Sequence, residues 1–379
     1  MSNQPERLTA PPDVSRIDAE NEAIAWPALE AIIHVDPAGR GLASYRRSGV
    51  ALDAGQLQAA ALDLAKNARS VAIVTGFFVE GEDGAAAETD GPPGALFLAR
   101  ALSDVGVDVC LMTDPYGLPM LITGKVLWKM HDVEIVDVPL ELGPATAPSV
   151  GDDDGDCEMI DRWFHNFLES PRGQSLTHVV AVERCGPSHT RTSVTSQVGT
   201  SPATLDLFSE LVPVEHRNRC HNMRGESIDK QTAKMHRLFD AIAARKQPIR
   251  TIGIGDGGNE IGMGSFRWSE LVVALDSPPA PWIVCRTPTD HTIVSGISNW
   301  GAYALALAVG RLCGAVDRGG QWSAEGQRSL IELMIEMTSA VDGLTRRNEP
   351  TVDGLPLNDY LRPLDELRRL LGYADAPPD

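Results

Sequence analysis

The residues best suited to chemistry lie in one glycine-rich segment, Gly253-Ile-Gly-Asp-Gly-Gly-Asn-Glu-Ile-Gly-Met-Gly264. Its glycines permit tight turns and let a ligand approach bare backbone N–H groups. Asp256, Asn259 and Glu260 add oxygen donors that suit Mg²⁺ or Mn²⁺, or that could grip a substrate ammonium group. We therefore predict these three residues as metal ligands and both acids as catalytic, against the alternative of a tight turn with solvated acids. The backbone groups predicted to bind substrate are those of Gly257, Gly258 and Asn259.

The same segment also contains the GxGxxG spacing of a dinucleotide site. Asp276, which ends a later apolar run over residues 271–275, would then be the acidic residue of that site. Gly262 and Gly264, however, would interrupt the helix that should pack beneath a pyrophosphate. Each would cost roughly 0.5 to 1 kcal/mol relative to alanine. No nucleotide cofactor is therefore expected.

Two further groups of polar residues follow predicted strands. Thr75 and Gly76 come directly after one apolar run and are predicted to bind substrate. Glu183 and Arg184 end another, where an ionisable group is costly unless it is paired or functional. We predict Glu183 as a third catalytic residue and Arg184 as a substrate ligand. A purely structural pair between them is the alternative.

Other candidates stand at the starts of helices or next to a cysteine. Thr89 and Asp90 precede Gly-Pro-Pro-Gly, which would hold them rigidly at a helix N-terminus, although capping alone would also explain Asp90. Arg224 could bind a carboxylate bidentately. All of the following are predicted to bind substrate: Thr89, Asp90, Asn222, Arg224, Ser298 and Asn299. The last two could instead cap the apolar helix that follows them.

Short β-branched runs alternate with helical patterns along the chain, and this alternation predicts how the candidates are positioned. Strands are expected at 70–75, 107–113, 133–138, 177–182 and 250–254, and helices at 94–105, 116–130, 158–169, 228–246, 299–312, 324–338 and 358–371. The order indicates an α/β fold, Rossmann-like and three-layered, with a mainly parallel sheet and helices on both faces. Ligands bind beyond the carboxyl ends of such strands, where most candidates fall. Residues 187–204, rich in Ser, Thr and Gly, are expected to form a surface loop.

Composition limits the function classes. The 52 acidic residues exceed the 33 basic ones, giving a formal net charge of −19, so a nucleic-acid partner is not expected. Six scattered cysteines, with no signal peptide and no long apolar run, favour a cytoplasmic protein without a membrane partner. We expect a disordered arm over 1–25, one α/β domain over 26–371 and a frayed tail over 372–379. Assembly as a homo-oligomer is left open.

Six segments, taken in order, resemble the D-glutamate cyclase family in its C-terminal domain. They are Glu88-Thr-Asp-Gly-Pro-Pro-Gly94, Val180-Ala-Val-Glu-Arg184, Asn222-Met-Arg224, Gly255-Asp-Gly-Gly-Asn-Glu-Ile-Gly-Met-Gly264, Ser295-Gly-Ile-Ser-Asn-Trp-Gly301 and Val352-Asp-Gly-Leu-Pro356. The likeness runs from about residue 32 to 357. It implies a lyase that closes D-glutamate to 5-oxo-D-proline with loss of water. The segment 187–219 is longer than its counterpart in the family, which implies a difference in substrate choice.

Lactam closure needs a deprotonated α-amine and an activated γ-carboxylate. We hypothesise that Glu183 or Glu260 takes the ammonium proton, while a metal on Asp256 and Asn259, or the N–H groups of the glycine segment, polarises the carboxylate. Arg224 would then clamp the α-carboxylate of this small amino-acid-like substrate. Two alternatives are metal-dependent chemistry on a small phosphorylated metabolite and a sensor that binds glutamate or 5-oxoproline without turnover.

Overall fold

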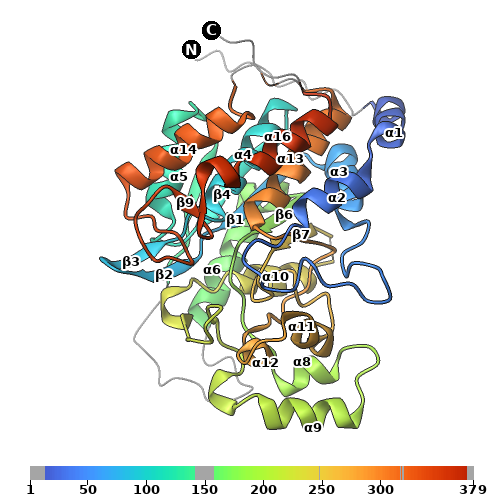
Figure 1. The fold of residues 1–379 in the computed structure, drawn as a ribbon, viewed down its shortest axis with the longest axis vertical. Coiled ribbons are helices and arrows are strands. Elements are labelled where there is room, and N and C mark those ends of the chain that lie inside the picture. Colours follow the sequence, from blue (N-terminus) through green and yellow to red (C-terminus); the bar gives the residue numbers. More distant parts are fainter. Residues whose placement is uncertain (1–12, 141–157, 247, 316, 318–319, 374–379) are drawn as a thin grey trace.

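A computed structural model describes residues 13–140, 158–246, 248–315, 317 and 320–373 (Figure 1). Its centre is a six-stranded parallel sheet in the order β5-β4-β1-β6-β7-β8. The strands are β1 (Ser70–Thr75), β4 (Asp108–Thr113), β5 (Glu134–Asp137), β6 (His178–Val182), β7 (Arg250–Gly255) and β8 (His291–Val294). Counted along the chain these are strands 3-2-1-4-5-6, the order of a doubly wound sheet. The winding direction reverses between β1 and β6, which is where such folds bind ligands.

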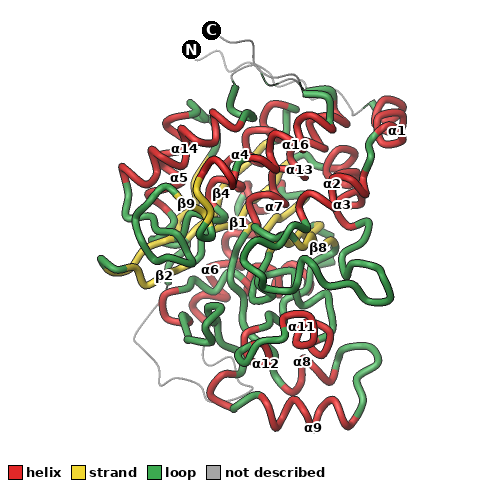
Figure 2. Tube along the Cα trace, viewed as in Figure 1, coloured by secondary structure: helices red, strands yellow, loops and turns green. Residues whose placement is uncertain are grey.

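Both faces of the sheet are covered, because successive residues of a strand point to opposite faces and those of β1 are apolar on both. In β1, Val71 and Ile73 join one hydrophobic core, whereas Ala72 and Val74 join a second core on the opposite face. Strands buried on both faces read as continuous apolar runs, which is why they could be located from sequence. Figure 2 shows the strands between helices on either side. The predicted three-layer α/β fold with a mainly parallel sheet is confirmed.

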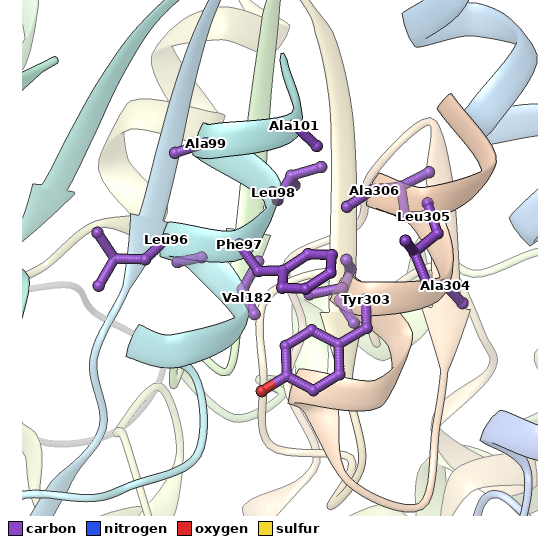
Figure 3. Packing of buried hydrophobic residues seen from close by; sticks show 14 of the residues in the cluster. Leu96, Phe97, Leu98, Ala99, Ala101, Val182, Tyr303, Ala304, Leu305 and Ala306 are labelled. Carbon is purple, nitrogen blue, oxygen red and sulfur yellow. The ribbon is translucent and has the colours of Figure 1, made fainter. Parts of the chain in front are cut away.

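The larger core packs under most of the helices and is centred on the contact between α4 and α13. Its helices are α1 (Val14–Ala23), α2 (Trp26–Ile33), α3 (Gln56–Asn67), α4 (Pro92–Asp104), α5 (Leu118–Leu127), α13 (Ser298–Cys313), α14 (Ala324–Met337), α15 (Leu357–Tyr360) and α16 (Arg362–Leu370). Phe97 of α4 lies against Tyr303 of α13, with ring centroids 4.8 Å apart (Figure 3). Large buried rings dominate the energetics of such a core. This packing holds the N-termini of α4 and α13 side by side.

The opposite face is covered by α6 (Glu158–Glu169) and α10 (His236–Ala243), followed along the chain by smaller elements. A third core lies among α8 (Arg191–Thr195), α9 (Pro202–Leu211), α11 (Trp268–Leu275) and α12 (Ala280–Ile283). The remaining elements are α7 (Pro171–Ser175), the 3₁₀ turns η1 (Val214–His216) and η2 (Asp229–Gln231), and the hairpins β2 (Phe78–Gly81) with β3 (Gly84–Ala87) and β9 (Thr351–Val352) with β10 (Leu355–Pro356). Among the described helices, none combines the length and apolar character needed to cross a bilayer.

Part of the segment expected to be a disordered arm is ordered. Residues 14–23 form α1, whose Ile17 is buried in the main core. Asp13 caps this helix through the Arg16 N–H, and the polar residues around Ile17 face outward. A helix with a single buried anchor has too weak a periodicity to be recognised by pattern. Residues 1–12 and 374–379, which include most of the expected frayed tail, lie outside the described residues.

Two further local predictions are wrong. The expected surface loop at 187–204 contains α8 and the start of α9, because its Ser and Thr residues are helix caps: Thr190 and Ser193 form a capping box and Ser201 caps α9. The helix expected from residue 228 begins only at His236, since Asp229 is held by Cys220 N–H and Lys234 instead. The apolar run 271–275, which Asp276 ends in the dinucleotide interpretation, belongs to α11.

Candidate active site

Three buried carboxylates meet at the carboxyl edge of the sheet, where the winding direction reverses. Glu183 follows β6, Asp256 follows β7, and Asp90 stands just before α4. Each offers an oxygen within 4.8 Å of the others, and all three side chains are buried. Because like charges so close together cannot all ionise without a counter-charge, this triad requires a cation, a proton or hydrogen-bond donors. Of the expected site residues, the structure thus brings Asp90, Glu183 and Asp256 together.

Ser298, the first residue of α13, supplies hydrogen bonds to all three acids. Its backbone N–H donates to Asp90 Oδ2 at 2.9 Å and to Asp256 Oδ2 at 3.2 Å. Its hydroxyl donates to Glu183 Oε2 at 2.5 Å. The N-terminus of a long helix is a favourable place for negative charge, because its first N–H groups lack helical partners and the helix dipole is positive there. The triad is therefore assembled around the start of α13.

Asn299 fixes the start of α4 relative to the triad. Its side-chain Oδ1 accepts from Gly91 N–H at 3.0 Å and from Gly94 N–H at 2.7 Å, and its Nδ2 donates to Thr89 O at 3.1 Å. Asp90 in turn accepts from the backbone N–H of Asn299 at 2.8 Å. Capping of a helix was the alternative for Asp90, and the structure shows that it caps α13 rather than its own helix.

Glu183 is held in an unusual backbone conformation, with φ at +43°. A non-glycine residue in this region is uncommon and costs energy, and such residues cluster at functional sites. Gly91 makes the position possible, because a Cβ there would lie 2.8 Å from Glu183 Cβ and 2.9 Å from Thr75 Oγ1. The hydroxyl of Thr75 is buried and has no hydrogen-bond partner among the described residues. The Thr75 hydroxyl near Glu183 is therefore available to form a hydrogen bond with a ligand.

Glu260 organises the glycine segment from within. Its Oε1 accepts from Gly257 N–H at 2.7 Å and Asp256 N–H at 3.3 Å, and its Oε2 accepts from Gly258 N–H at 2.8 Å. The backbone groups of Gly257 and Gly258, predicted to bind substrate, are therefore occupied by a side chain of the same loop. Asn259 donates from Nδ2 to His221 O at 2.8 Å, and its buried Oδ1 has no partner within the described residues. Glu260 thus closes the nest of N–H groups that an anion would otherwise fill.

Arg40, from the loop between α2 and α3, provides positive charge next to the triad. Its Nη1 lies 3.1 Å from Asp256 Oδ2. The same guanidinium binds Asp353 bidentately, with Nη1–Oδ2 and Nη2–Oδ1 distances of 2.9 Å. Asp353 and Gly354 have φ values of +51° and +76° and connect the paired residues of β9 and β10. This is the conformation of a two-residue hairpin turn, for which Asp-Gly is favoured.

Electrostatics at the triad favour protonated acids. Burial raises the pKa of Asp90 to about 7, with a further contribution from Asp353, despite the N–H groups of Asn299 and Ser298 that act in the opposite direction. Burial, followed by the charges of Asp256 and Glu260, raises the pKa of Glu183 well above its usual range. Burial also raises the pKa of Asp256, although Arg40 opposes the shift. The site can therefore hold both a proton donor and a proton acceptor near neutral pH.

Arg184, Gly76 and Asp114, which follow β6, β1 and β4, form a structural unit. The fully buried guanidinium of Arg184 donates to Asp114 Oδ2 at 2.6 Å, to Gly76 O at 2.7 Å and to Ala233 O at 2.8 Å. The alternative for Arg184 was a structural ion pair with Glu183. The structure shows a structural ion pair, but its partner is Asp114. Thr89 is likewise engaged, since its hydroxyl donates to Thr351 O at 2.8 Å.

Asn222 and Arg224 lie in a turn away from these hydrogen bonds. The Asn222 side chain accepts from Arg224 N–H and Glu226 N–H and donates to the Glu226 carboxylate. Arg224 is exposed, and its Nη2 donates to Leu344 O at 3.1 Å. Desolvation and the neighbouring Arg346 lower the pKa of Arg224. The structure therefore does not join either residue to the triad by a direct contact.

Sequence reasoning missed Arg40, Asp353 and Glu88 as members of the site. Glu88 is buried, and burial together with Asp353 and Asp90 raises its pKa well above the usual range. Glu88 and Asp353 lie within segments that resemble the family, and the other local signals were the Asp-Gly turn at 353 and the Gly-Arg-Gly spacing around residue 40. Both indicate turns, and neither indicates where the charged side chain points. Their role depends on contacts between opposite ends of the chain.

Residues 29–368 match a family model described as D-glutamate cyclase-like, C-terminal. The chain is also similar to the mitochondrial D-glutamate cyclase of Homo sapiens, with 29% identity over 284 residues. The aligned part covers 74% of this chain but 38% of the human protein. The chain thus spans well under half the length of that relative.

Proposed function

The chain belongs to the D-glutamate cyclase-like, C-terminal family, and on this premise we propose that it interconverts D-glutamate with 5-oxo-D-proline and water. The observation that carries the proposal is the triad of Asp90, Glu183 and Asp256 around the start of α13. Paired carboxyls with raised pKa values can exchange protons with a substrate near neutral pH. The reaction is of the lyase type, and it is reversible.

Cyclisation joins the α-nitrogen to the γ-carboxyl carbon and breaks one C–O bond of that carboxylate. Two of the three ammonium protons must leave nitrogen, and both end on the departing oxygen as water. The active site therefore needs one group that accepts a proton from nitrogen and one that delivers a proton to oxygen. Holding the substrate coiled for ring closure is itself worth roughly 7 to 11 kcal/mol in well-oriented intramolecular reactions.

In the proposed mechanism, Glu183 takes the ammonium proton. Its strained backbone directs its carboxylate toward Asp90 and Asp256, and the Ser298 hydroxyl donates a hydrogen bond to one of its oxygens. Asp90, whose pKa is raised to about 7 by burial, would deliver a proton to the departing oxygen. Glu260 keeps its carboxylate on the N–H groups of Gly257 and Gly258, so we assign it the positioning of the loop rather than proton transfer.

A divalent cation suits the same residues. Carboxylate oxygens are the donors that Mg²⁺ and Mn²⁺ prefer, and the triad is buried with more acidic groups than Arg40 can neutralise. Asp256 would hold the ion, with Asn259 Oδ1 as a further oxygen donor on the loop. When bound, it would polarise the γ-carboxylate as a Lewis acid.

The phosphorylated-metabolite alternative is weaker. It relied on the glycine segment as a cradle for a phosphate, and the Glu260 carboxylate occupies the N–H groups of that cradle. A phosphate would have to displace a buried carboxylate that accepts three hydrogen bonds. The same argument weighs against a pyrophosphate at this loop.

The test is direct. Purified protein is incubated separately with D-glutamate, L-glutamate and 5-oxo-D-proline, with Mn²⁺ and with EDTA, and followed by proton NMR. We expect interconversion of D-glutamate and 5-oxo-D-proline that Glu183→Gln abolishes. Binding of either compound by calorimetry without interconversion in any condition would favour the sensor alternative and contradict the proposed reaction.

A further inference from the structure

A substrate with two carboxylates needs a cation to enter a site rich in acids. Besides the triad, Glu88, Glu260 and Asp353 are all buried nearby, and each of them repels a carboxylate when it is ionised. The guanidinium of Arg184 is fully buried and donates to Asp114 and two carbonyl groups. Arg224 is exposed and donates to Leu344 O. Of these guanidinium groups, only Arg40 directly contacts the triad.

Arg40 uses one edge of its guanidinium and leaves the other edge open. The Nη1–Nη2 edge is paired with Asp353, and Nη1 also faces Asp256 and, at 3.4 Å, Gly296 O. Within the described part of the chain, Nε makes no hydrogen bond, and Nη2 makes only the bond to Asp353. The side chain is 17% exposed, in contrast to 3% for Asp256. A guanidinium presents two forked edges that match a carboxylate, so a second bidentate site remains.

The loop that carries Arg40 is firmly held. Asp36 accepts from the backbone N–H groups of Arg40 at 3.0 Å and Gly41 at 2.7 Å. Gly41 has φ at +90°, and a Cβ there would lie 2.4 Å from Ala274 O. Together with the bidentate bond to Asp353, these contacts fix the plane of the guanidinium. A preorganised cation binds its ligand with less loss of conformational entropy.

We propose that the Nε–Nη2 edge of Arg40 binds the α-carboxylate of the substrate, with Asp353 as the positioning residue that holds its plane. The inference rests on the proposed function, because ring closure requires the γ-carboxylate to lie at the triad and leaves the α-carboxylate to be held elsewhere. It moves the clamp from Arg224 to Arg40. It also names the ligand class of this edge as a carboxylate on the carbon next to nitrogen.

The test compares ligands that differ only in this group. 5-Oxo-D-proline carries the carboxylate and 2-pyrrolidinone lacks it, and binding of both is measured by calorimetry or by competition. Arg40→Lys keeps the charge but loses the fork, and we expect about 10- to 100-fold weaker binding of 5-oxo-D-proline. Binding of 2-pyrrolidinone should not change. Asp353→Asn, which tolerates the positive φ, should weaken only 5-oxo-D-proline, by a smaller factor.

Arg347→Lys, at an exposed arginine paired with Glu82, is the matched control and should leave both affinities unchanged. Equal loss for both ligands in Arg40→Lys, or unchanged binding of 5-oxo-D-proline, would overturn the proposal, as would a wild-type protein that binds no carboxylate ligand. Circular dichroism and Tm confirm that each variant is folded. Because the readout is binding, an Arg40 effect without turnover would contradict the proposed reaction alone.

Discussion

Asp90 caps α13, the helix that contains Asn299, and Asn299 caps α4, the helix that follows Asp90. The Asp90 carboxylate accepts the backbone N–H of Asn299 at the start of α13, and the Asn299 amide oxygen accepts the N–H groups of Gly91 and Gly94 at the start of α4. The N-termini of two helices that are far apart in sequence are thus held together by reciprocal side-chain caps. The same contacts place Asp90 beside Glu183 and Asp256.

Loss of the Asn299 side chain should destabilise the fold. Asn299→Ala removes the side-chain acceptor of the buried Gly94 N–H and one of two acceptors of the Gly91 N–H, which keeps Asp90 Oδ1. An unsatisfied buried group costs about 1–3 kcal/mol. We expect the free energy of unfolding, measured by urea denaturation, to fall by about 2–4 kcal/mol. Ser323→Ala removes an ordinary cap from α14 and should cost only about 1 kcal/mol. Equal costs for both would refute the reciprocal capping.

Removal of the proposed base should separate activity from stability. Glu183→Gln should lower kcat by about 10²- to 10⁴-fold, the usual contribution of general base catalysis. It should not lower Tm, because the amide has the shape of the carboxylate and its oxygen can still accept the Ser298 hydroxyl. Ser298→Ala keeps the backbone N–H bonds and should lower kcat by a smaller factor. Full turnover in Glu183→Gln, with exposed Glu226→Gln as control, would exclude Glu183 as the base.

Stability should depend on pH through Asp90. Burial raises the pKa of Asp90 to about 7 in the folded protein, against about 3.8 as its ordinary value. The folded state therefore binds more protons than the unfolded state between these values, and stability falls as pH rises through them. Relative to Asp90→Asn, the wild type should lose on the order of 1 kcal/mol per pH unit from about pH 4 to 7 and level off above. Chemical denaturation of both proteins across this range measures the difference, and a constant difference would contradict the assignment.

A divalent cation should stabilise the wild type. Mn²⁺ or Mg²⁺ at 100 times its Kd would add about 2.7 kcal/mol to the free energy of unfolding and raise Tm. Asp256→Asn should abolish most of this shift, whereas Glu325→Gln, on an exposed turn of α14, should retain it. If Asp256→Asn kept the whole Mn²⁺-induced shift, the ion would be bound elsewhere. EDTA should reverse the shift in the wild type.

Much of the architecture was readable from local patterns. The strands ending at Thr75 and Gly255, and the helix from Ser298, follow from apolar runs and periodicity that involve only neighbouring residues. Glu183 was found because an acid at the end of a buried strand is costly. The errors at 187–204 and 228–235 arose where Ser, Thr and Asp side chains make specific bonds. Such bonds have no periodic signature.

By itself, the sequence determined five strands of the sheet, several of its helices and the strand ends at which Glu183 and Asp256 lie, because those depend on short-range apolar spacing. It did not locate the edge strand β8. The tertiary structure decided which acids meet. Asp256 faces Arg40 while Glu260, four residues on, turns inward to its own loop. Arg40 and Asp353 pair across 313 residues, and this pairing depends on how the two ends of the chain pack over the sheet. No local pattern encodes a contact that exists only once both ends are folded.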